Sequence, residues 1–259
     1  MIRSSLGRFC AFAILFAASE TSSVFAEQAA PEGGDFRVAV EIAEILSDGS
    51  EKVFDRRVVI FYANKAYDFA MLAPNDVTVV DPVGGHVTML SRKQNVRSVI
   101  PHLELVEATG RMRAYLVKEK RGKELGVGVP VQVIAGEDGN SHYEVAFTGK
   151  KYTSTVSKPL ASDHAARFAE FNEWVARVNL YRRLGSPPFA RMALGSQISD
   201  DGLIPGEIEL QIDAEGQKRR YVTRYTFAKK LTRDDQKRVD DAAGMMTLYT
   251  SVPPANFPR

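Results

Sequence analysis

The chain has 259 residues, with 34 lysines and arginines against 32 aspartates and glutamates, and a formal net charge of +2 at pH 7. A charge so close to balance provides no general field that would draw the protein onto nucleic acid or an anionic membrane, so we expect neither as a partner. Cys10 is the only cysteine, which excludes a disulfide framework and a thiolate metal site and leaves packing as the source of stability.

The first 26 residues have the pattern of a cleavable secretory signal peptide. Arg3 and Arg8 provide a positive start, and the run from 9 to 18 (FCAFAILFAA) is apolar and uncharged. We expect cleavage after Ala26 and a protein that works outside the cytoplasm, in the periplasm or secreted. A run of about ten apolar residues is too short for a membrane span, which needs about twenty, and no later window approaches that length. We therefore expect no integral membrane segment after cleavage.

The remaining chain is expected to contain a flexible leader over residues 27–35, a single β-rich α+β domain over 36–252 and a loose tail over 253–259. From Phe36, apolar and polar residues alternate as in a strand, and short turn-forming stretches interrupt the pattern up to Ile100. Connections of hairpin length force antiparallel pairing, because a parallel crossover needs a dozen residues or more. The pattern predicts an antiparallel β meander, a curved sheet or half-barrel covered by several helices.

Helices are needed because the segment 58–63 (VVIFYA) is apolar on both faces, whereas a sheet with one solvated face would alternate. Both faces of this strand must therefore be covered. The sequence predicts helices over about 101–120, from Ser162 to about 182, over about 189–194, and from Thr232 to about 246. Ser162 is the expected N-cap of the second helix, and Thr232 with Asp235 resembles a capping box for the last.

Two further hairpins are predicted, one over about 142–156 and one over about 207–227. In the last strand Tyr221, Tyr225 and Phe227 share one face. Arg220 and Arg224 share the other face, so the buried side of this hairpin can be assigned from the alternation.

Local catalytic and metal-binding motifs are missing from the sequence. The four histidines, His86, His102, His142 and His164, lack the spacing of a helical metal pair, and no Gly-x-Ser-x-Gly or complete glycine-rich nucleotide loop occurs. The adjacent aspartates at 200–201, 234–235 and 240–241 diverge on a helix or turn and do not face each other across a bond as glycosidase carboxylates do. We expect no metal and no cofactor.

The order of strands and turns over 58–100 is distinctive, with YANKAYDF at 62–69, VTVVDP at 77–82 and HVTML at 86–90. Together with PPFAR at 187–191 and GLIP at 202–205, this order resembles an uncharacterised family of exported bacterial proteins. The resemblance covers most of the chain after residue 26 and implies no particular activity. More remotely, an exported meander that carries helices is similar in architecture to the periplasmic lipoprotein carriers, whose half-open barrel holds acyl chains.

The leading functional hypothesis is a non-enzymatic extracytoplasmic protein whose curved sheet and helices enclose an apolar cleft for a lipid, an acylated protein or another hydrophobic group. The candidate lining residues are Val59, Phe61, Tyr225 and Phe227. An ordinary core uses the same residue types, so the cleft is a hypothesis rather than a deduction.

Two alternatives stay open. One is an envelope hydrolase whose site is assembled from distant residues such as His86, His142 and Asp81. The other is a structural or protein-binding module of the cell envelope, which would present an exposed apolar patch.

Overall fold

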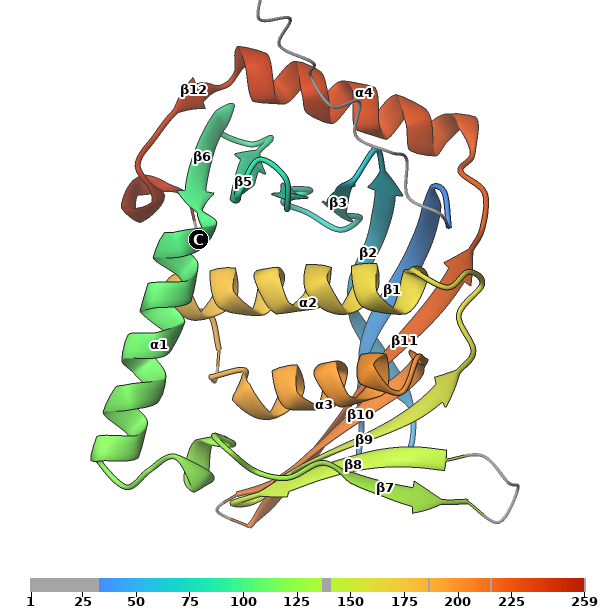
Figure 1. The fold of residues 1–259 in the computed structure, drawn as a ribbon, viewed down its shortest axis with the longest axis vertical. Coiled ribbons are helices and arrows are strands. Elements are labelled where there is room, and N and C mark those ends of the chain that lie inside the picture. The colour runs from blue at the N-terminus through green and yellow to red at the C-terminus, as the bar shows by residue number, and fades with distance from the viewer. Residues whose placement is uncertain (1–32, 137–140, 186, 215, 259) are drawn as a thin grey trace, which may run out of the picture.

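A computed structural model describes residues 33–136, 141–185, 187–214 and 216–258. The expected signal peptide and residues 27–32 of the expected leader lie outside these ranges. Within them, twelve strands form one sheet in the order β12-β6-β5-β4-β3-β2-β1-β11-β10-β9-β8-β7, and four α-helices pack on it (Figure 1). Neighbouring strands are antiparallel except for β12 and β6. The predicted α+β class, an antiparallel meander covered by helices, is confirmed, and the curled sheet does not close into a barrel.

The N-terminal strands are β1 (Phe36–Ile45), β2 (Glu51–Tyr62), β3 (Lys65–Ala70), β4 (Val77–Asp81), β5 (His86–Ser91) and β6 (Val96–Pro101). The later strands are β7 (Gln132–Ala135), β8 (Ser141–Phe147), β9 (Lys150–Ser157), β10 (Ile204–Ala214), β11 (Gln217–Ala228) and β12 (Thr250–Ser251). The helices are α1 (His102–Lys118), α2 (His164–Tyr181), α3 (Phe189–Asp200) and α4 (Arg233–Leu248), with single 3-10 turns at η1 (Lys123–Leu125) and η2 (Pro254–Asn256). The short strands β7 and β12 were not expected from the sequence.

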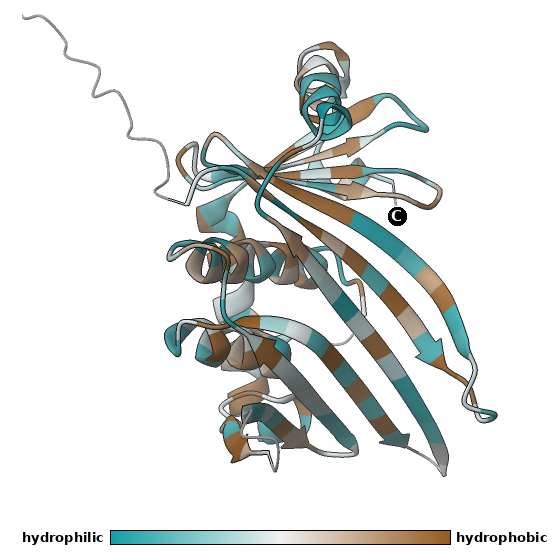
Figure 2. Ribbon diagram, turned by 90° about the vertical axis from the view of Figure 1, so that its right-hand side faces the viewer, coloured by the Kyte–Doolittle hydropathy of each residue, from teal (hydrophilic) through white to brown (hydrophobic). Residues whose placement is uncertain are grey.

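Strand β2 delivers alternate side chains to two different cores. Val59 and Phe61 pack in a cluster with Phe168 of α2, while Ile60 packs in a second cluster with Val239 of α4. Figure 2 shows α4 on one side of the sheet and α2 and α3 on the other. We call the side that faces α2 and α3 the inner face and the side that faces α4 the outer face. The prediction that both faces of this strand are covered is confirmed.

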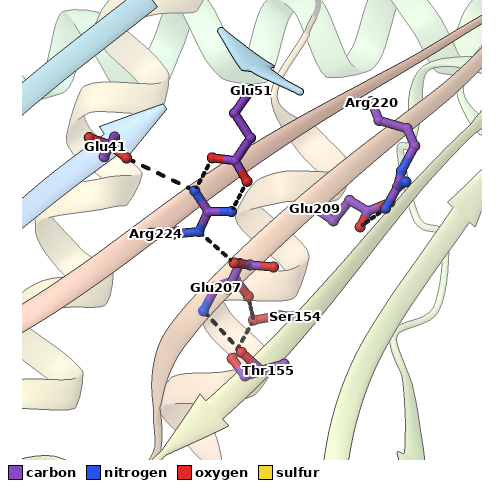
Figure 3. A network of polar contacts seen from close by, with 8 residues as sticks. All are labelled: Glu41, Glu51, Ser154, Thr155, Glu207, Glu209, Arg220 and Arg224. Carbon is purple, nitrogen blue, oxygen red and sulfur yellow. Dashed lines mark hydrogen bonds and ion pairs between the residues drawn. The ribbon is translucent and has the colours of Figure 1, made fainter. Parts of the chain in front are cut away.

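Paired charges cover the outer face where β1, β10 and β11 meet. The Arg224 guanidinium donates to the Glu51 carboxylate at 2.7 and 2.6 Å and to Glu207 at 2.9 Å (Figure 3). Ala43 and Val222, which are opposite each other on β1 and β11, are only 0% and 3% exposed beneath this network. Long charged side chains therefore shield apolar surface with their aliphatic parts on this face.

Of the two predicted helix N-caps, the one of α4 is confirmed and the one of α2 is wrong. α2 begins at His164 with Asp163, not Ser162, at its N-cap, and no side chain caps it; the Asp163 carboxylate instead pairs with Arg167 one turn later, at 3.3 Å. In α4 the capping box is present as predicted: the Thr232 hydroxyl accepts from the backbone N–H of Asp235, whose carboxylate accepts from the N–H of Thr232.

Helix α3 is longer than the sequence indicated. The sequence predicted it over about 189–194, yet it continues to Asp200 through Gly195, a residue with a low helix propensity. Leu194 and Ile198 are buried against β8 and β10, and this burial outweighs the cost of the glycine.

Both ends of the described chain are held in place. At the start, the Gly34 carbonyl accepts a hydrogen bond from Arg167 at 2.6 Å. At the other end, the Val252 N–H donates to the Arg97 carbonyl at 2.8 Å, and Phe257 is 5% exposed within the cluster under α2. The segment expected to be a loose tail therefore packs on the fold, because its one aromatic side chain finds a buried site.

Candidate functional site

The four residues predicted to line a cleft belong to one cluster. Val59 and Phe61 on β2 and Tyr225 and Phe227 on β11 all face α2, where the Phe168 ring centroid lies 5.1 Å from that of Phe227, 5.4 Å from Tyr225 and 6.3 Å from Phe61. Val59 and Phe61 are 1% and 2% exposed, whereas Tyr225 and Phe227 are only partly buried. These residues do meet in space, and their role in binding a ligand stays a prediction.

The pocket beside Phe61 is too small for an acyl chain. It has a volume of about 30 Å³ and is lined in part by Phe61, Arg167 and Glu170. A space of this size holds water. The Arg167 guanidinium closes it further, since it lies 5.0 Å from the Phe36 ring and 5.6 Å from the Phe61 ring. A larger ligand at this position would require α2 to move away from β2.

The inner face continues beyond the helices, because the long strands β1, β2, β10 and β11 extend past α2 and α3 (Figure 2). From the part of the inner face that lies against α2 and α3 into this extension, five of the inward-pointing side chains are apolar or aromatic and only partly buried: Val40, Ile42, Leu210, Tyr221 and Tyr225. We call these five the inner apolar band. Val40 is opposite Tyr225, and Leu210 is opposite Tyr221. Phe54 lies at a bulge in β2 and is 49% exposed. Its ring packs edge-to-face against that of Tyr221, with the two centroids 6.0 Å apart.

A buried ion pair lies beside the inner apolar band, toward β3. Arg57, opposite Val40 in the register, donates two hydrogen bonds of 2.7 Å to the carboxylate of Asp68, whose side chain is 3% exposed. Asp55 adds a third contact at 3.4 Å. Burial disfavours the charged form of Arg57, but the Asp68 and Asp55 carboxylates outweigh it and raise the pKa of Arg57. This charge is fully compensated by protein groups.

A cation from α3 lies on the opposite side of the band. Arg191 donates a hydrogen bond of 2.8 Å to the phenol oxygen of Tyr225. Burial raises the pKa of Tyr152, which lies close enough to Arg191 to interact with its charge. Among the residues that the structure describes, no carboxylate forms an ion pair with Arg191. An acidic group on a ligand of the band would therefore meet an uncompensated cation here.

A second polar cluster surrounds the turn between β4 and β5. Asp81 accepts hydrogen bonds from the Gly84 N–H at 2.7 Å and from Lys65 at 2.8 Å, and it is opposite His86 in the register. Burial raises the pKa of Asp81, but the hydrogen bonds from Lys65 and Gly84 outweigh burial and lower it below its ordinary value. At the start of α1, burial and the neighbouring His86 lower the pKa of His102. These shifts favour the ionised form of the Asp81 carboxylate and the neutral form of the His102 imidazole.

The residues named for a hydrolase are not assembled into one site. His142 lies on β8, and six strands separate β8 from β4 in the sheet. The two Asp81 oxygens accept hydrogen bonds from Gly84 and Lys65, and the Nδ1 atom of His86 donates a hydrogen bond of 2.9 Å to the Gly84 carbonyl. In the described ranges no group of three or more His, Cys, Asp and Glu side chains could hold a metal ion.

A wider pocket, which the sequence did not reveal, lies between α4 and the turns that follow β3 and β5. Its volume is about 390 Å³, within the range of small-molecule sites. Phe69 and Met71 contribute apolar surface, and the charged lining residues are Arg92, Asp234, Lys237, Arg238 and Asp241. The mixture of signs suits a polar molecule rather than an acyl chain. Three separate segments supply these residues, so no local pattern could have marked the pocket.

No family model and no curated protein matches this chain. Among solved structures it is similar to an uncharacterized conserved protein from Thermus thermophilus, with a TM-score of 0.36 and 10% identity over 86% of this chain and 91% of the other. It is also similar to a putative outer membrane lipoprotein-sorting protein domain from Vibrio parahaemolyticus, with a TM-score of 0.28 and 8% identity over 81% and 92% of the two chains. At these scores the likeness carries no argument about function.

No helix within the described ranges is both long and apolar enough to cross a membrane.

Proposed function

We propose that this chain is a non-enzymatic binding protein that works outside the cytoplasm and holds a lipid acyl chain or another hydrophobic group against the inner face of its sheet. The inner apolar band carries the proposal. Its side chains project from ordered strands of one continuous sheet, yet they are only partly buried. Covering such a surface with an apolar ligand removes it from water, which is favourable.

The contrast between the two faces of β11 supports this assignment. Tyr221 and Tyr225 point inward, whereas Arg220 and Arg224 point outward and are paired with glutamates of β10 and β2. The same stretch of strand therefore has a charged outer face and an apolar inner face.

The free energy gained by burying an acyl chain is large enough for a lipid to bind. Each buried methylene contributes about 0.8 kcal/mol, so about ten methylenes contribute about 8 kcal/mol before the entropic cost of association is subtracted. Arg191 and the Tyr225 phenol would contact an acidic group at one end of the ligand. Val59, Phe61 and Phe227 continue the band beneath α2 and would form its closed end.

The test compares one inner-face variant with one outer-face control. Protein purified from a bacterial envelope is examined by native mass spectrometry with lipid extraction, and then titrated with a dansyl-labelled fatty acid. Ile42→Lys places a charge in the inner apolar band at a partly exposed position, and Thr226→Lys places the same charge on an exposed outer position of β11. We expect binding to be lost in Ile42→Lys and kept in Thr226→Lys.

A wild-type protein that carries no apolar passenger and does not bind the dansyl probe would refute the proposal. Equal loss of binding in both variants would indicate that the ligand does not bind at the inner apolar band. Hydrolysis of an ester substrate that depends on Asp81 and His86 would favour the hydrolase alternative instead.

A further inference from the structure

The pocket beside α4 differs in position and in character from the inner apolar band. It lies on the outer face, because Phe69, one of its lining residues, packs in the cluster that α4 covers. Its volume of about 390 Å³ is more than ten times that of the space beside Phe61. We call it the α4 pocket. The proposed function makes no use of it.

One flank of α4 provides the charged wall of the α4 pocket. The four lining residues from this helix follow the i, i+3, i+4, i+7 spacing of a single helix face: Asp234, Lys237, Arg238 and Asp241. At 1.5 Å per residue, the two cations lie midway along this face, with a carboxylate about 5 Å away on either side. The helix therefore presents the charges in the order negative, positive, positive, negative.

The turns that follow β3 and β5 complete the α4 pocket. Arg92, after β5, adds a third cation. Phe69 and Met71, which are 1% and 37% exposed, provide an apolar surface, and the Asn75 side chain provides an amide that can both donate and accept a hydrogen bond. The α4 pocket thus combines charges of both signs with an apolar wall.

The charged side chains of the α4 pocket have no protein partners. Asp234 and Arg238 are four residues apart, as are Lys237 and Asp241, a spacing that often forms ion pairs on a helix. Over the ranges that the structure describes, however, neither these four side chains nor that of Arg92 forms an ion pair. All five charges are therefore available to a ligand.

We propose that the α4 pocket binds a small zwitterion of the amino-acid type, with a carboxylate, an ammonium group and an apolar side chain. A simple anion would gain from the three cations but would be repelled by the two carboxylates, and a simple cation would meet the converse. Only a ligand of both signs gains from all five charges. Its carboxylate would contact Lys237, Arg238 or Arg92, and its side chain would pack against the apolar wall.

The affinity of such a site is expected to be low. Arg92, Asp234, Lys237 and Asp241 are exposed, and only Arg238 is partly buried. Exposed charge pairs are screened by water and each contributes little, so we expect a dissociation constant on the order of 1 mM for a single amino acid. This inference goes beyond the proposed function and does not rest on it, because the two sites lie on opposite faces of the sheet.

The first experiment asks whether both charges of the ligand are needed. L-Leucine is titrated against the full chain up to about 20 mM by saturation-transfer NMR, a range that covers the expected affinity. Two analogues each lack one charge: 4-methylpentanoate has no ammonium group, and 3-methylbutylamine has no carboxylate. We expect leucine to bind at least threefold more tightly than either analogue.

The second experiment locates the site with matched variants. Arg92→Gln and Asp241→Asn each remove a charge that lines the α4 pocket, whereas Lys93→Gln and Asp240→Asn remove the same charges from exposed neighbouring positions that do not line it. We expect leucine to bind about two- to fivefold more weakly to the first two variants and unchanged to the two controls. For 4-methylpentanoate the sign should differ, because Asp241→Asn removes a repulsion and should tighten its binding, while Arg92→Gln should weaken it.

This reversal separates an effect on the ligand from damage to the fold, which would weaken both ligands alike. Leucine that binds no more tightly than its analogues would overturn the proposal. So would leucine binding that Arg92→Gln and Asp241→Asn leave unchanged, since the ligand would then lie elsewhere on the protein.

Discussion

Replacing Asp68 with asparagine would test how much the ion pair beside the inner apolar band contributes to stability. The Asp68 carboxylate accepts hydrogen bonds from Nε and Nη2 of Arg57, both at 2.7 Å, and its side chain is 3% exposed. Asparagine has nearly the same size, but it is neutral and has only one acceptor oxygen. Its amide group would point N–H donors at the guanidinium, so at least one Arg57 donor would lose its partner.

Removing one member of a buried pair leaves the other charge uncompensated and typically costs about 3–5 kcal/mol. Arg57 keeps Asp55 at 3.4 Å, and its side chain is 27% exposed, so we expect a loss near the lower end, about 3 kcal/mol. Urea unfolding can be followed by fluorescence, because Trp174 is the single tryptophan. With a denaturant dependence of about 3 kcal/mol per molar, the urea midpoint should fall by roughly 1 M.

The matched control is Asp55→Asn, since Asp55 is 28% exposed and contacts the same guanidinium. This change should cost less than about 1 kcal/mol. The double replacement Arg57→Met with Asp68→Leu removes both charges and should recover most of the stability. If Asp68→Asn destabilised the protein no more than Asp55→Asn, the buried pair would not contribute as argued.

Three further predictions concern the same unfolding free energy. Thr232→Ala removes the N-cap of α4 and should cost about 1 kcal/mol, whereas no change would show that the capping box is redundant. Phe257→Ala should cost about 3 kcal/mol because this ring is 5% exposed, and a tail that did not pack would make the substitution neutral. Burial lowers the pKa of His164, which is 0% exposed, below its ordinary value of about 6.5. The unfolded state therefore takes up a proton first as the pH falls, so stability is complete above about pH 6.5 and decreases below it. Urea midpoints measured from pH 7 to 5 should show this decrease, and His164→Gln should make it smaller.

The sequence predicted which side chains lie on which face of a strand, but it did not predict which strands are neighbours in the sheet. Residues 58–63 are apolar on both faces, which predicted that both sides of this strand are covered. The prediction is confirmed, and the cover comes from α2 and α4. Period-two alternation cannot say which strand lies beside which, so the pairing of β1 with β11 was not predictable. β7 and β12 were missed because four and two residues are too few to show a period.

The same limit applies to the candidate site. Alternation placed Tyr225 and Phe227 on one face, and they do point inward. That they meet Val59 and Phe61 depends on where α2 presents Phe168, which is a property of the tertiary structure. The hydrogen bond between Arg191 and Tyr225 joins α3 to β11, and no sequence pattern in either segment predicted it.

The pairing of β1 with β11 has a consequence for how the protein reaches its native state. Arg37 is opposite Ala228, and the outer side of the N-terminal meander is covered by α4, which begins only at Arg233. The apolar side chains of Ile60 and Leu90 therefore lack their cover from α4 until nearly the whole chain has been synthesised. Contacts this distant in sequence form slowly, and the uncovered strands are prone to aggregate in the meantime. The chain is thus expected to fold after its synthesis is complete, and to depend on chaperones until its last helix docks.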